Sequence, residues 1–174
     1  MRWVVDDGPL GLLARFFDPG WLWRPDTLEI MDSVAASAPQ DKSGRRQQLL
    51  ALQASARPAI AVRSLLVGSE AANVVLNYLR QDTRSATRDL GEDESIAYCM
   101  VEAKDAVFVT MDKRAAFVAL AELGPVRVAT PFDLWGWLAE ERMLNATVRT
   151  ALFEASHGAD RGLPGVPRRV SLSG

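Results

Sequence analysis

Carboxylates follow two of the short apolar segments of the sequence. Asp6 comes directly after the run Trp3-Val4-Val5, and Asp112 stands two residues beyond the segment 106–110. Both segments are predicted to be strands, because short β-branched and aromatic runs bounded by charge are typical of strands. The carboxyl ends of parallel strands meet at one edge of a sheet. We therefore expect the two carboxylates to lie near each other.

Further acidic residues are predicted to join them. Glu92 and Glu94 stand in the first turn of a predicted helix over 91–102, and Asp32 lies in a predicted helix over 26–36 that follows Pro25. Ionised carboxylates that lie together raise one another's pKa, so such a cluster needs a cation. Oxygen ligands without His or Cys select Mg²⁺ or Mn²⁺, which activate water for phosphodiester hydrolysis. Four such groups, spread over more than 100 residues of the sequence, would then converge in space.

Each carboxylate also has a purely local interpretation. Glu92, Asp93 and Glu94 would suit a helix N-terminus electrostatically, and Asp112 would serve as an N-cap. A neighbouring residue could cap the following helix as well as Asp6 does. Helix capping therefore explains the acid at position 6 less well than it explains the other carboxylates.

Composition excludes several other kinds of chemistry. The 174 residues include one cysteine and one histidine, too few for a zinc site, a disulfide framework or a paired Cys and His. Cys99 lies in an apolar helical stretch and is predicted to be buried, and His157 is predicted to be a solvated tail residue. The net charge of −2 does not mark a nucleic-acid-binding protein, although 20 basic residues leave a local patch open.

Strands alternate with helices along the chain. Strands are predicted at 3–6, 21–23, 58–62, 106–110 and 126–129, and helices at 10–17, 26–36, 47–56, 69–80, 91–102, 113–123, 132–142 and 145–155. This alternation predicts an α/β fold with a parallel sheet and helices on both faces. One domain is expected over 1–157, followed by a flexible Gly/Pro/Arg tail over 158–174. Without an apolar run of 18 residues or a signal peptide, the chain is predicted to be cytoplasmic and not membrane-bound.

The opening residues 4–10 (VVDDGPL) at first resemble a receiver domain of a response regulator. That family also needs a phosphoacceptor Asp after the third strand and a Lys after the fifth. The segments 62–65 (VRSL) and 128–131 (VATP) supply neither residue. The receiver interpretation therefore fails at two of its defining positions.

Three acidic motifs and a closing strand together resemble the PIN domain family. Residues 6–14 (DDGPLGLLA) resemble its opening Asp with a Pro-Leu helix start, and 91–97 (GEDESIA) is similar to a Gly-Glu-x-Glu-x-Ile-Ala segment of one subgroup. Residues 109–115 (VTMDKRA) resemble its Thr-x-Asp strand end, and 124–130 (GPVRVAT) its closing strand. PIN domains are metal-dependent ribonucleases, many of them toxins of toxin–antitoxin pairs.

The resemblance implies a three-layer α/β/α sandwich with a central parallel sheet, and a Mg²⁺ or Mn²⁺ site that includes Asp6, Glu92 and Asp112. The family's remaining acid is usually a Glu on the second helix. Asp32 is our prediction for that place, with Glu29 and Glu70 as competitors. The implied function is endoribonuclease activity, with RNA as substrate and an antitoxin protein as partner. The alternative is a PIN-like binding or regulatory module without catalysis.

Neighbouring residues have two interpretations each. Thr110 would orient a ligand or a bound water, while Lys113 and Arg114 would meet phosphates or form a solvated first turn of a helix. The five tryptophans include two alternating pairs, 21 with 23 and 135 with 137. We predict core packing or homodimer contact for them, with base stacking on RNA as the alternative.

Overall fold

The computed structural model describes residues 1–16, 28–36, 44, 60–80, 89–141, 143–160, 163 and 166. Within them, five parallel strands form one sheet in the order β3-β2-β1-β4-β5. They are β1 (Trp3–Val5), β2 (Leu28–Met31), β3 (Ile60–Arg63), β4 (Val107–Val109) and β5 (Val128–Ala129). Val4 of the central strand pairs with Glu29 on one side and with Phe108 on the other. Strand β3 lies at one edge of the sheet, and β5 lies at the other.

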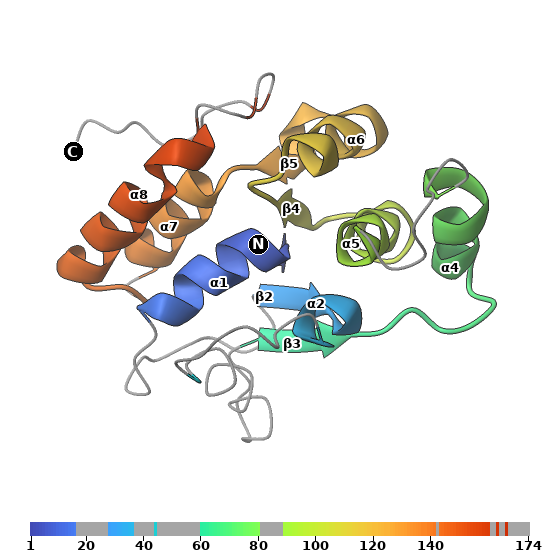
Figure 1. Cartoon of the computed structure of the whole chain (residues 1–174), viewed down its shortest axis with the longest axis horizontal. Helices are drawn as coiled ribbons and strands as arrows, with labels where there is room; N and C mark the ends of the chain where they lie inside the picture. Colours follow the sequence, from blue (N-terminus) through green and yellow to red (C-terminus); the bar gives the residue numbers. More distant parts are fainter. Residues whose placement is uncertain are drawn as a thin grey trace.

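Helices cover both faces of the sheet, which makes the predicted three-layer α/β/α sandwich (Figure 1). One layer contains α1 (Asp7–Arg15), α7 (Pro131–Glu140) and α8 (Ala146–Asp160). The other contains α2 (Asp32–Ala36), α4 (Glu70–Val74), α5 (Leu90–Val101) and α6 (Lys113–Leu123). A π-helical turn, η2 (Val75–Leu79), continues α4, and the 3₁₀ helix η3 (Pro125–Arg127) precedes β5.

The core lies between these layers and explains the tryptophans that the structure describes. Trp135 is fully buried and donates its indole N–H to the hydroxyl of Ser156 over 2.8 Å. Trp3 is buried against Trp137, with ring centroids 5.8 Å apart. The prediction of core packing is confirmed for these three, whereas Trp21 and Trp23 lie outside the described residues. Cys99 is buried as predicted, and this burial raises the pKa of its thiol to about 12.

The predicted helix over 26–36 is wrong in its first half. Residues Leu28–Met31 form β2, which lies between two other strands and is buried throughout. A short apolar run flanked on both sides by strands fits a buried strand as well as a helix, and its periodicity alone does not distinguish the two. Asp32 is consequently the first residue of α2, directly after a strand, and not two turns into a helix.

The C-terminal helix is longer than the sequence predicts. Helix α8 reaches Asp160, so His157 lies inside a helix, and the boundary expected between 157 and 158 falls within that helix. Beyond it, Leu163 is buried and Val166 packs against the core. The rest of the predicted tail, the strand expected at 21–23 and the helix expected at 47–56 lie outside the described residues. Among the helices that the structure describes, none is long and apolar enough to cross a membrane.

Candidate carboxylate site

The central strand marks the point where the sheet changes direction. From β1 the chain continues to β2 and β3 on one side, while β4 and β5 lie on the other. In open parallel sheets, ligands bind outside the carboxyl ends of the strands at such a switch point. Asp6 follows β1, and Asp112 stands three residues after the end of β4. The two strand-end carboxylates predicted from the sequence therefore lie at the edge of the sheet where ligand sites are found.

Asp6 is almost completely buried at the start of α1. Its side chain accepts hydrogen bonds from the backbone N–H of Asp7 and from the hydroxyl of Thr110, each over 2.7 Å. Asp6 is therefore the N-cap of α1, a local role that the sequence analysis did not assign to it. Burial raises the pKa of Asp6 to about 6, although both hydrogen bonds oppose this shift.

Asp112 is the N-cap of α6, as its local interpretation predicts. Its Oδ1 atom accepts hydrogen bonds from the backbone N–H groups of Arg114 (2.7 Å) and Ala115 (3.0 Å). Its own N–H donates to the hydroxyl of Thr110 over 3.0 Å. Both capping bonds use the same oxygen, so capping does not by itself exclude a second role for this carboxylate.

Glu92 lies in the first turn of α5 and faces these acids. Burial, together with the negative charges of Asp6, Asp112 and Asp89, raises the pKa of Glu92 to about 8. The guanidinium group of Arg114, 3.3 Å away, acts in the opposite direction. Three of the four predicted site residues thus interact electrostatically.

Asp89 is a member of this cluster that the sequence analysis missed. It precedes α5 with a left-handed backbone (φ 59°, ψ 15°), a conformation that Asp and Asn tolerate better than most residues. Asp89 lies between the helices predicted at 69–80 and 91–102, outside every predicted element. Its position two residues before the Gly-Glu motif is the only signal that would have pointed to it.

The prediction for the fourth acid is not supported by the contacts. Asp32 accepts a hydrogen bond from the N–H of Ser33 (2.8 Å), and its charge raises the pKa of Glu94, which burial already raises. The Ser33 hydroxyl also donates to Glu94. Asp32 and Glu94 thus interact with each other at the contact between α2 and α5, whereas Asp89 takes the place beside Glu92.

The two competitors for that fourth place lie elsewhere. Glu29 is buried in β2, where its carboxylate binds Arg2 (2.9 Å), Arg63 (3.2 Å) and the hydroxyl of Tyr98 (2.9 Å). Two guanidinium groups compensate its charge, which gives Glu29 a structural role. Glu70 is exposed in the first turn of α4, whose N-cap is a serine.

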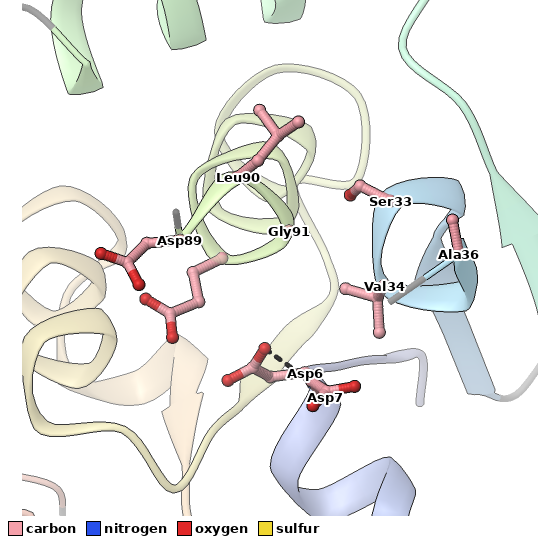
Figure 2. Close-up of a pocket in the computed structure, with 9 residues that line it drawn as sticks. Asp6, Asp7, Ser33, Val34, Ala36, Asp89, Leu90 and Gly91 are labelled. Atoms are coloured by element: carbon pink, nitrogen blue, oxygen red, sulfur yellow. Dashed lines mark hydrogen bonds between the residues drawn. The ribbon is translucent and has the colours of Figure 1, made fainter. Parts of the chain in front are cut away.

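A cavity of about 530 Å³ opens beside the cluster. The carboxylates of Asp6 and Asp89 lie on one side of it and residues of α2 on the other (Figure 2). It is lined by Asp6, Asp7, Ser33, Val34, Ala36, Asp89, Leu90, Gly91 and Glu92. Gly91 permits the close approach of α5 to α2, because a Cβ atom there would lie 2.7 Å from Cγ2 of Val34.

The donor atoms of the cluster fit a hard divalent cation. Asp6, Glu92, Asp112 and Asp89 offer only carboxylate oxygens, which suit Mg²⁺ and Mn²⁺ better than zinc. The repulsion that raises the pKa of Glu92 is also the interaction that a bound cation would relieve. Across the described part of the chain, however, no three Asp, Glu, His or Cys side chains are arranged as a ready-made metal-binding group.

The strand order distinguishes this sheet from that of receiver domains. Receiver domains have the strand order 2-1-3-4-5. The order observed here differs from it and agrees with the exclusion of that family from the sequence. A comparison of the chain with known protein families, curated proteins and solved structures finds no match.

Proposed function

We propose that this protein is a Mg²⁺- or Mn²⁺-dependent endoribonuclease of the PIN type. One observation carries the proposal: Asp6, Glu92 and Asp112, which are distant in the sequence, interact electrostatically at the switch point of a parallel sheet. Repelling carboxylates are costly to fold, so their presence at a ligand-binding edge is typical of a functional site.

The residues of the turn after β1 indicate that a phosphate group would bind there only together with a cation. The observed order matches the first five strands of dinucleotide-binding folds, in which a Gly-rich turn after the first strand lets a phosphate approach a helix N-terminus. In this chain Asp6 and Asp7 occupy that turn, where their negative charge would repel a bare phosphate. A phosphodiester that enters here would need a compensating cation.

Each residue of the site would have a distinct role in the reaction. Asp6, Glu92 and Asp112 would hold the cation, and Thr110 would keep Asp6 in place. The cation would activate water and stabilise negative charge on the phosphodiester. The choice of RNA as substrate, a role as a toxin and an antitoxin as partner are proposed on the PIN resemblance of residues 6–14, 91–97 and 109–115.

Cleavage of a structured RNA pool with Mn²⁺ tests this proposal. We expect the wild type to cleave, and we expect EDTA or Asp6→Asn to abolish cleavage. Asp105→Asn is the matched control, because it removes an exposed carboxylate that pairs with Arg2 away from the cluster. Circular dichroism would verify the fold of each variant. A folded wild type that neither cleaves RNA nor binds Mn²⁺ in calorimetry would contradict the proposal and favour the non-catalytic module.

A further inference from the structure

Arg114 connects the first turn of α6 to the carboxylate cluster. Its Nη2 atom lies 3.2 Å from Oδ1 of Asp93, and its Nη1 atom lies 3.3 Å from Glu92 and 3.7 Å from Asp89. The side chain is 40% exposed, whereas Asp93 is fully buried. One edge of the guanidinium group is thus anchored on a buried acid, and the other faces the candidate site.

The two edges contact acids of different exposure. Both edges make contacts longer than the usual length of about 2.7 to 2.9 Å for a charge-assisted hydrogen bond, but Asp93 is fully buried, whereas the side chains of Glu92 and Asp89 are 15% and 27% exposed. Asp93 does not depend on Arg114 alone, because Arg80 binds its other oxygen over 2.9 Å and is nearly buried. Movement of Nη1 away from Glu92 would therefore leave the buried acid compensated.

Arg114 and a divalent cation would compete for the same carboxylate. Glu92 belongs both to the proposed metal-binding set and to the contacts of Arg114. A single positive charge that contacts two acids of the cluster compensates part of their repulsion, and a divalent cation would compensate more. When the cation displaces Nη1 from Glu92, Nη2 would stay bound to Asp93 and would keep the guanidinium group beside the site. Nη1 could then donate hydrogen bonds to a phosphate group, which arginine binds well.

We propose that Arg114 is the counter-ion of the carboxylate cluster in the metal-free protein, and that it exchanges Glu92 for a substrate phosphate when a divalent cation binds. This inference rests on the proposed function and adds a substrate-binding residue to it. A permanent structural link between α5 and α6 would make the opposite prediction, since Arg114 would then keep its contacts when the cation binds.

Calorimetry with Mn²⁺ alone, carried out above pH 8 where the Glu92 carboxyl group is mostly ionised, tests the exchange. We expect Arg114→Gln to bind Mn²⁺ roughly two- to fivefold more tightly than the wild type, which corresponds to one partly exposed ion pair. Arg114→Lys keeps the charge and should bind as the wild type does. Lys113→Gln is the matched control, because it removes the same charge from the adjacent exposed residue. Equal affinities for Arg114→Gln and Lys113→Gln would overturn the inference.

Two further measurements test the inference, and the first uses only the wild type, so it does not depend on how a variant folds. In the wild type, the Nε–H NMR signal of Arg114 should shift on addition of Mg²⁺, while that of Arg80 should not. With RNA, Arg114→Gln should raise KM several-fold and change kcat by less than about twofold, as expected for a residue that binds a phosphate. An unmoved Arg114 signal or an unchanged KM would overturn the inference while the proposed function stands. Failure of every protein to bind Mn²⁺ would overturn both.

Discussion

Thr110 donates its hydroxyl hydrogen to Oδ2 of Asp6 over 2.7 Å, and this bond joins the end of β4 to the end of β1. Both side chains are buried. The same hydroxyl accepts the N–H of Asp112 over 3.0 Å. One small side chain therefore fixes the relative position of two carboxylates at the switch point, and it favours the ionised form of Asp6.

Replacement of Thr110 by valine should reveal this coupling. Thr110→Val keeps the shape but leaves the Asp6 carboxylate and the Asp112 N–H without this partner, which should lower the free energy of unfolding by about 1–3 kcal/mol. The pKa of Asp6 should rise further, because the lost hydrogen bond lowers it. Urea unfolding at pH 7 measures the first effect. Thr110→Ser retains the hydroxyl and should stay close to the wild type, whereas equal stability of all three proteins would contradict the prediction.

The raised pKa of Glu92 predicts a pH-dependent stability of the metal-free protein. Its pKa is about 8 in the fold against a reference value of 4.5, so between these values the folded state binds more protons than the unfolded state. The free energy of unfolding should therefore fall as the pH rises through this window. Asp6, with a pKa of about 6, contributes to the fall only in the lower part of the window. Thermal unfolding in EDTA from pH 5 to pH 9 measures the decline.

Glu92→Gln provides the comparison for this decline. The variant should lose the part of the fall that lies between pH 6 and pH 8 and should exceed the wild type in unfolding temperature at pH 8. Glu102→Gln removes an exposed carboxylate just beyond the other end of α5 and should leave the decline in place. An identical pH profile for the wild type and Glu92→Gln would show that burial and repulsion do not raise the pKa of Glu92 as predicted.

The strand ends were predictable from the sequence because short-range signals determine them. Compact apolar runs followed by acid located Asp6 and Asp112, and a glycine before acidic residues located the start of α5 near Glu92. The helices α6 and α7 were likewise predicted within two residues of their ends, since Asp112 and Thr130-Pro131 are strong start signals.

The rest depended on contacts that sequence spacing does not encode. Leu28–Met31 is a strand because β1 and β3 flank it, and Glu29 is compensated there by arginines 27 positions before it and 34 after it. Asp89 faces Glu92 because a left-handed residue turns the chain into α5. Such long-range pairings override local propensity, and they place Asp89 beside Glu92 and Asp32 beside Glu94.

The affinity for Mn²⁺ should increase with pH if Glu92 is a ligand. Below its pKa of about 8 the carboxyl group carries a proton that the cation must displace. The association constant should therefore rise between pH 6 and pH 8, by up to about tenfold per pH unit for one released proton. Calorimetry in two buffers of different ionisation enthalpy counts that proton. A pH-independent affinity with no proton release would exclude Glu92 from the metal-binding set.

Gly91 should control the cavity between α2 and α5. In Gly91→Ala the new methyl group would meet Cγ2 of Val34 at 2.7 Å, and Val34 is buried and β-branched, so it has little freedom to turn away. We expect a loss of about 1–3 kcal/mol in the free energy of unfolding. Gly11→Ala is the matched control, because no atom lies within 4 Å of its added Cβ in α1, and it should stabilise the protein by about 0.5–1 kcal/mol.

The double variant Gly91→Ala/Val34→Ala separates this clash from other effects of the added methyl group. Removal of the valine methyl groups should recover part of the stability lost in Gly91→Ala, so that the two substitutions are less than additive in urea unfolding. If the losses simply add, the methyl group at position 91 acts through something other than Val34. The contact between α5 and α2 would then not determine which residues position 91 tolerates. Packing other than this contact would hold Glu92 beside Asp6.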